Sequence, residues 1–286
     1  MIMKRGLQIL VVVSTMYIFT KCTQNPIFSD NIIPAANHWV RGQVMLSDSI
    51  IAKGAAVWME GYELGAFTDD NGEFNILLPP GGSFQAGAEN GIFRLFFYVG
   101  NYEIVCRYVV IIDGKVASNQ GDVGLQGFLN DKVSLKKLLD IETHVQPLII
   151  SDGPDTLHCE VVLTPTENDT IQFLAQANRS YLFSAFLRSL DYPQAKIIKA
   201  QTASMLLNVF TIDKSELRMK LNIYIRPAEL LGGRHEVIPF IILYQPYLPE
   251  GLKRLINYDF QSYNLAYLNI PYHRRGGQFE VIPTSQ

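Results

Sequence analysis

The chain has 286 residues, of which 48% are hydrophobic and 18% are charged, and its formal net charge is -3. This composition supports a buried core in one or two domains and excludes an intrinsically disordered chain. A mildly acidic chain without a basic run is also a poor nucleic-acid binder, because neutralising phosphates requires clustered Lys and Arg.

Residues 1–22 are organised like an export signal. Lys4 and Arg5 form a basic start, and an uncharged apolar run over residues 7–20 follows. As a helix this run spans about 21 Å, less than the roughly 30 Å hydrocarbon core of a bilayer. A short apolar run behind a basic start is typical of a secretory signal rather than a membrane-spanning helix.

Cys22 follows the apolar run directly and resembles the lipidated cysteine of bacterial lipoproteins. The residues before it are Phe19, Thr20 and Lys21, where that signal has a leucine-like residue, a small residue and Gly, Ala or Ser. An ordinary cleaved signal and an uncleaved anchor are the alternatives. The resemblance implies an exported protein, anchored by lipid at the outer membrane or in the periplasm, with residues 23–37 as a polar tether.

From residue 40 onward, strand-forming runs alternate with turn signals. Strands are predicted over residues 40–46, 54–60 and 64–67. A hairpin turn is predicted at residues 68–74, because its Asp, Asn and Gly residues accept the backbone angles of a tight turn. In the next strand Phe74, Ile76 and Leu78 alternate with Asn75 and Leu77, and Pro79-Pro80-Gly81 ends the strand.

Four short motifs run through this stretch at regular spacing: Gly42-Gln43-Val44, Gly54-Ala55-Ala56-Val57, Thr68-Asp69-x-x-Gly72-x-Phe74 and Pro79-Pro80-Gly81. They resemble the carboxypeptidase regulatory-like domain, a transthyretin-like (prealbumin-like) β-sandwich. Residues 93–99, the turn at 100–102 and residues 103–112 fit its looser continuation. The resemblance implies a non-catalytic binding or spacer module over residues 38–140, with about seven strands.

The second half also has the pattern of an all-β domain, over residues 144–286. Residues 132–143 are expected to close the first domain with a last strand and to lead into the second. Further strands are predicted at residues 157–163, 171–175, 181–187, 217–225 and 237–244, and short helices at residues 200–207 and 250–256. The fold class is therefore all-β, with two tandem β-sandwich domains. An immunoglobulin-like second domain is an analogy only.

The sequence contains no recognisable catalytic, metal-binding or cofactor-binding motif. The segment at residues 81–85 lacks the last glycine of a nucleophile elbow. His235-Glu236 begins a zinc-protease motif, but Pro239 stands where the second histidine belongs. A calcium loop with Gly72 at its sixth position would need a ligand at Phe67, which has none. We therefore predict a protein that is not an enzyme and uses no cofactor, while a site assembled from distant residues stays open.

Two further features leave alternatives open. Cys106 and Cys159 either pair in an oxidising compartment or remain buried free thiols. Near the C-terminus an aromatic segment precedes Arg274 and Arg275, and its rings either stack on a sugar or partner, or pack the second domain. Its members are Tyr258, Phe260, Tyr263, Tyr267 and Tyr272.

Three functional hypotheses follow. The leading one is a non-catalytic cell-envelope lipoprotein that acts as a binding or scaffold module at the membrane surface, with an unknown protein or glycan partner. The alternative is a glycan-binding, adhesin-type protein that uses the aromatic segment. A hydrolase with a dispersed site is the third.

Overall fold

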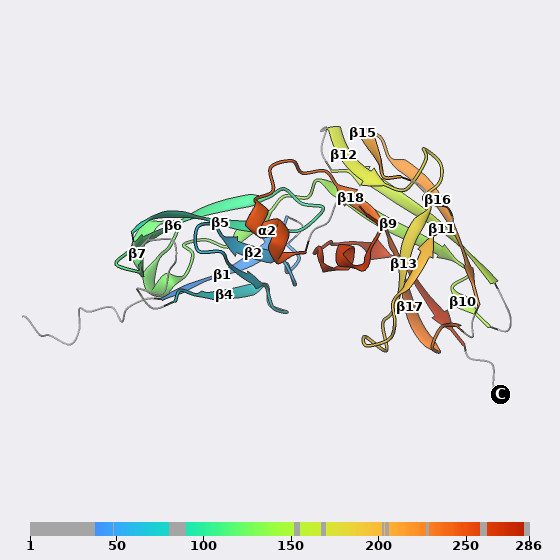
Figure 1. Ribbon diagram of the computed structural model, residues 1–286, viewed down its shortest axis with the longest axis horizontal. Helices are drawn as coiled ribbons and strands as arrows, with labels where there is room; N and C mark the ends of the chain where they lie inside the picture. Colours follow the sequence, from blue (N-terminus) through green and yellow to red (C-terminus); the bar gives the residue numbers. More distant parts are fainter. Residues whose placement is uncertain are drawn as a thin grey trace, which may run out of the picture. The chain divides into compact units, whose positions relative to one another are not determined.

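The computed structural model describes residues 38–47, 49–79, 90–151, 155–166, 170–201, 203, 206–226, 229–257 and 262–282. Most of these residues lie in strands, arranged in several sheets (Figure 1), which confirms the predicted all-β class. Residues 38–286 form one compact unit. The predicted signal, Cys22, the tether, Tyr258 and Phe260 lie outside the described residues.

The first sandwich pairs a three-stranded sheet with a five-stranded one. Its sheets have the strand orders β4-β1-β8 and β3-β2-β5-β6-β7. A one-turn 3-10 helix, η1 (Leu125–Gly127), precedes β8. The strands are β1 (Trp39–Leu46), β2 (Ala56–Met59), β3 (Leu64–Phe67), β4 (Glu73–Leu77), β5 (Gly91–Tyr98), β6 (Val105–Ile112), β7 (Lys115–Gly121) and β8 (Val133–Leu135).

Alternation along β4 decides which side chains enter this core. Phe74, Ile76 and Leu78 are buried, whereas Leu77 is exposed. The predicted hairpin turn at residues 68–74 is wrong in one respect. The turn is tight, but β3 pairs with β2 and β4 pairs with β1, so the turn carries the chain from one sheet to the other.

The segment at residues 132–143 runs from the sheets of the first sandwich to those of the second. Its first part is β8, which runs parallel to β1 and pairs Val44 with Val133. Its second part begins β9 (Leu139–Gln146), which pairs antiparallel with β11 (Asp155–Pro165). The chain therefore passes from one set of sheets to the next within three residues.

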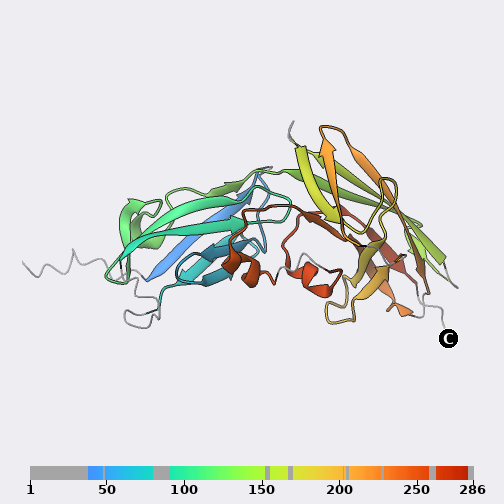
Figure 2. The same ribbon diagram turned by 45° about the horizontal axis from the view of Figure 1, so that its top comes forward.

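The second sandwich has sheets with the orders β10-β20-β17-β13-β14, β16-β11-β9-β19 and β15-β12-β18. Figure 2 shows these strands in green to red, apart from those of the first sandwich in blue to green. The remaining elements are β10 (Ile149–Ile150), β12 (Thr170–Ala175), β13 (Ser184–Ser189), β14 (Ile198–Gln201), β15 (Asn208–Asp213), β16 (Leu217–Ile225), β17 (Gly233–Pro239), β18 (Ile241–Leu243), α2 (Glu250–Leu255), η3 (Leu265–Asn269), β19 (Arg275–Gly276) and β20 (Gln278–Val281).

Two predicted elements differ from those in the structure. The helix predicted over residues 200–207 is wrong, since Ala200 lies in β14 and pairs with Ala185 of β13. Pairing with a neighbouring strand overrides the local helix preference of such a short segment. The strand predicted over residues 237–244 is divided at Phe240, because β17 pairs with β13 whereas β18 pairs with β12. The short helix predicted at residues 250–256 is confirmed as α2.

Among the described residues, three clusters of buried apolar side chains stabilise the fold. One lies inside the first sandwich and one inside the second. The third contains residues of both sandwiches, among them Trp58 and Phe96 of the first and Phe240 and Leu252 of the second. In agreement, α2 lies against β2 (Figure 1), and Gly251 of α2 faces the Trp58 ring so closely that an added Cβ would lie 2.1 Å from it.

Candidate binding site

A hollow of about 860 Å³ opens on the second sandwich. Strands β9, β11 and β16 and the glycines after Arg275 line it. The hollow exists because β19 runs parallel to β9 and the chain then turns at Gly276, whose φ is +74°. A Cβ at Gly276 would lie 2.2 Å from the Thr143 carbonyl oxygen, so only glycine allows this approach.

The polar side chains of the hollow come from two cross-strand rows. His158 lies opposite Gln146 of β9 and Asn222 of β16. Two residues further along β11, Glu160 pairs with a histidine and a lysine, His144 of β9 and Lys220 of β16. Residues two apart on a strand share a face, so these side chains point the same way.

A hydrogen-bond contact joins one imidazole of the hollow to an amide side chain. His158 Nδ1 lies 2.9 Å from Asn222 Oδ1. The contact holds the imidazole against the neighbouring strand, because His158 and Asn222 are paired across β11 and β16. The hollow therefore presents an ordered imidazole and amide beside a positive charge, since Lys220 is exposed on the neighbouring row.

The acidic groups on this sheet are engaged by arginines. Glu160 Oε2 accepts a hydrogen bond of 2.8 Å from Arg218 Nη1. Glu142 Oε2 lies 3.0 Å from Arg275 Nη2, which also bonds Asp140. Because arginines already occupy these carboxylates, the groups left to bind a ligand in the hollow are the amides, the imidazoles and the lysine.

Cys159 lies between these rows but faces the core. Burial raises the pKa of its thiol to about 12, so the reactive thiolate is almost absent near neutral pH. Both Cys159 and Cys106 are free, which answers the alternative left open by the sequence. Cys106 is half-buried rather than buried. The hollow is thus suited to reversible binding of a polar partner by hydrogen bonds.

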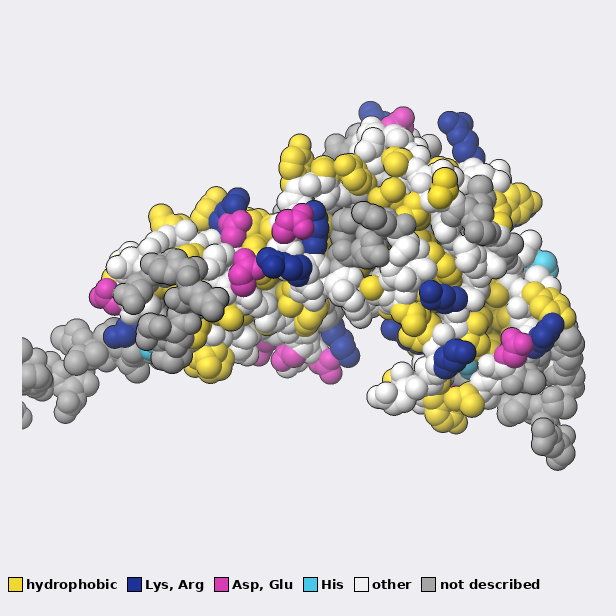
Figure 3. All heavy atoms as spheres, in the orientation of Figure 1, with side chains coloured by type: hydrophobic (Ala, Val, Ile, Leu, Met, Phe, Trp, Pro, Cys, Tyr) yellow, Lys and Arg dark blue, Asp and Glu magenta, His cyan; other side chains and the backbone are white. Residues whose placement is uncertain are grey.

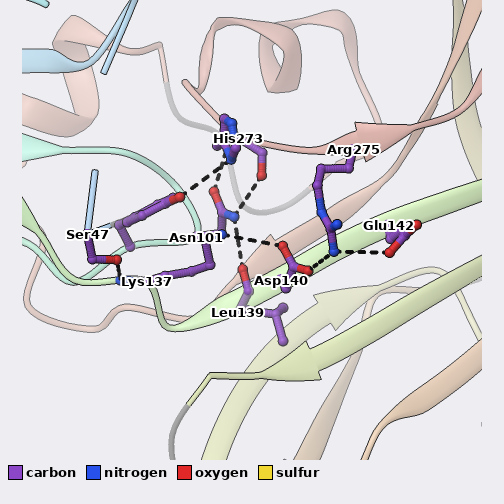
Figure 4. A network of polar contacts seen from close by, with 9 residues as sticks. Ser47, Asn101, Lys137, Leu139, Asp140, Glu142, His273 and Arg275 are labelled. Carbon is purple, nitrogen blue, oxygen red and sulfur yellow. Dashed lines mark hydrogen bonds and ion pairs between the residues drawn. The ribbon is translucent and has the colours of Figure 1, made fainter. Parts of the chain in front are cut away.

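A second polar arrangement joins the two sandwiches and centres on Asn101 (Figure 4). Its amide Nδ2 donates to the carbonyl oxygens of Leu139, at 2.9 Å, and His273, at 2.8 Å. Its Oδ1 accepts from the His273 backbone N–H at 3.0 Å. Asn101 is fully buried, so it ties a turn of the first sandwich to both β9 and the C-terminal segment. Sequence reasoning passed over this residue as part of a turn.

The three described rings of the aromatic segment pack inward. Tyr267 is buried, and its hydroxyl lies 2.8 Å from the Pro239 carbonyl oxygen and 2.9 Å from that of Ile241. Tyr263 is half-buried, 4.7 Å from the Phe186 ring centroid. Half-buried Tyr272 accepts from the Leu243 backbone N–H at 3.0 Å. These three rings do not form the exposed row that stacking on a sugar requires.

Other candidates for chemistry stay dispersed. His235 is buried in β17, where its Nδ1 lies 3.0 Å from the Gly233 carbonyl oxygen. The described residues hold no group of three or more His, Cys, Asp or Glu side chains that could bind a metal ion. They also contain no helix whose length and apolar character would let it span a bilayer.

Comparison with known proteins gives no relative. No family model matches the chain, and no curated protein or solved structure matches it either.

Proposed function

We propose that this protein is a non-catalytic lipoprotein of the cell envelope that holds a partner at the membrane surface. The signal-like residues 1–22 support the location, with Cys22 as the lipidated residue and residues 23–37 as the tether. The observation that carries the proposal is the core shared by the two sandwiches. A shared apolar core opposes motion of one sandwich relative to the other, which suits a spacer or scaffold.

We assign the first sandwich to the carboxypeptidase regulatory-like domains as part of this proposal, and the roles of its motif residues support that. Thr68 Oγ1 accepts from the Ala55 backbone N–H at 2.8 Å and donates to the Ala52 carbonyl oxygen. Asp69 Oδ1 accepts from the backbone N–H groups of Asn71, at 2.8 Å, and Glu73, at 2.9 Å. These residues fix a turn and carry no chemistry of their own.

The hollow of the second sandwich is the place we propose for the partner. It offers several hydrogen-bonding side chains on one rigid sheet, which suits a polar segment of a protein. The glycan alternative rests on the aromatic segment, and the inward packing of Tyr263, Tyr267 and Tyr272 does not favour it.

Site-directed photocrosslinking in cells tests the proposal. A photoreactive residue at Gln146, which lines the hollow, should capture a defined envelope component. The matched control is Thr164, which is exposed on β11 of the same sheet and does not line the hollow. Equal capture at both positions, or none at Gln146, would contradict the assigned binding site. Hydrolysis of a peptide, ester or glycan that a point mutation abolishes would refute the non-catalytic role.

A further inference from the structure

A small apolar patch lies where the chain enters β1. Trp39 is 36% exposed and pairs with Leu77, which is 52% exposed, at the end of β4. Phe128 and Leu125 are 47% and 68% exposed, and the Phe128 backbone N–H donates to the Leu125 carbonyl oxygen at 3.3 Å. We call these four side chains, together with Arg41, the entry patch. Figure 3 shows that hydrophobic side chains also reach the surface elsewhere. Exposed apolar side chains alone therefore do not identify a binding surface.

The entry patch differs from the other apolar surface in containing Arg41. Its guanidinium carbon lies 4.8 Å from the Trp39 ring centroid and 5.7 Å from that of Phe128, so the cation joins the two rings. No carboxylate of the described residues pairs with Arg41, and its buried Nε has no hydrogen-bond partner among them, which leaves the terminal guanidinium nitrogens to meet an anion from outside. By contrast, Arg94 on β5 of the same sandwich pairs with Glu60 at 2.5 Å. An aromatic-bracketed arginine without a carboxylate matches an anionic group such as a phosphodiester.

The position of the patch indicates what covers it. The apolar run at residues 7–20 and Cys22 both precede His38 in the chain, and Trp39 follows His38 directly. The 15 residues 23–37 between Cys22 and His38 reach at most about 50 Å when fully extended. A chain held by lipid at Cys22 therefore keeps the start of β1 near the bilayer more closely than any other described element.

We infer that the entry patch docks on the phospholipid surface, with Trp39, Phe128, Leu77 and Leu125 at the level of the headgroups and Arg41 on a lipid phosphate. Tryptophan and arginine both favour this interface, because each combines an apolar body with a polar end. The inference rests on the proposed lipid anchor and adds an orientation to it. The first sandwich contacts the membrane, whereas the second sandwich, which contains the hollow, does not.

A second copy of the chain is a weaker occupant. Stable protein interfaces use about 20–30 residues on each side. The entry patch has five, so it is too small to hold a dimer by itself. It is large enough to orient a protein that a lipid already holds at the surface, because the anchor supplies most of the binding free energy.

Tryptophan quenching on vesicles tests the inference with the full-length lipidated protein. The chain has two tryptophans, and Trp58 is buried, so Trp39 is the one a lipid can reach. In vesicles of phosphatidylglycerol and phosphatidylethanolamine with brominated acyl chains, the wild type should lose roughly half of its emission. The Trp39→Phe variant, which retains only Trp58, should lose almost none. Arg41→Gln should reduce the quenching, whereas the matched Arg94→Gln should leave it unchanged.

The outcomes separate the docking from the anchor. Protein that floats with the vesicles but shows equal quenching in wild type and Trp39→Phe would overturn the docking and keep the lipoprotein. A blue shift of Trp39 emission without bromine quenching would show that a protein covers the patch, and would also overturn it. Protein that fails to float would refute the lipid anchor, and the docking with it.

Discussion

Replacing Asn101 with alanine should weaken the junction between the two sandwiches. The side chain is fully buried and makes three hydrogen bonds, to the Leu139 carbonyl oxygen and to both the N–H and the carbonyl oxygen of His273. Alanine leaves these backbone groups without their partner, the Leu139 carbonyl in a buried position and the His273 groups in a part-buried one. Each bond contributes about 1 kcal/mol net, and unsatisfied buried groups cost more, so the loss should be about 3 kcal/mol.

Urea denaturation of the full-length protein measures this loss, followed by circular dichroism and by tryptophan emission. Measured in the Trp39→Phe background, the emission reports the shared core, because Trp58 is then the only tryptophan and belongs to that core. We expect the midpoint of the emission change to fall in Asn101→Ala and to separate from the midpoint of the dichroism change, since the sandwiches then unfold less cooperatively.

Two variants sharpen the test. Asn101→Asp keeps the acceptor oxygen for the His273 N–H but removes both donated bonds, so it should also be destabilised. Asn75→Ala changes an exposed asparagine on β4 and should alter the free energy of unfolding by less than about 0.5 kcal/mol. An Asn101→Ala loss below about 1 kcal/mol, with coincident transitions, would refute the reasoning.

Two further predictions concern single sites. Gly72 and Gly54 share a φ of +73°, but a Cβ at Gly72 would lie 2.5 Å from the Val44 carbonyl oxygen whereas one at Gly54 meets nothing within 4 Å. In thermal denaturation Gly54→Ala should cost about 1 kcal/mol and Gly72→Ala clearly more; equal losses would contradict this. For the thiols, a pKa of about 12 leaves roughly one Cys159 in ten thousand as thiolate at pH 8. A thiol reagent should modify Cys159 only in denaturant, and rapid native modification, read by mass spectrometry, would contradict its burial. Half-buried Cys106 should react first.

The sequence by itself predicted the class of the fold and much of its local structure. Val, Ile and aromatic runs between turn residues placed most strands, and the alternation over residues 74–78 matches the burial found there, with Phe74, Ile76 and Leu78 buried. Period-two alternation reports the burial of each side chain directly, because successive residues of a strand face opposite sides of the sheet. The helix at residues 250–256 was likewise local enough to be predicted.

Which distant segments of the chain pair or pack with one another was decided only by the tertiary structure. The turn at residues 68–74 connects two sheets, the segment near Ala200 pairs as a strand, and Tyr267 turns into a core that both sandwiches share. Nor did any local pattern indicate Asn101, whose hydrogen-bond partner His273 lies 172 residues further along the chain. Local periodicity reveals that a face is buried, whereas the surface that buries it depends on contacts between residues far apart in sequence.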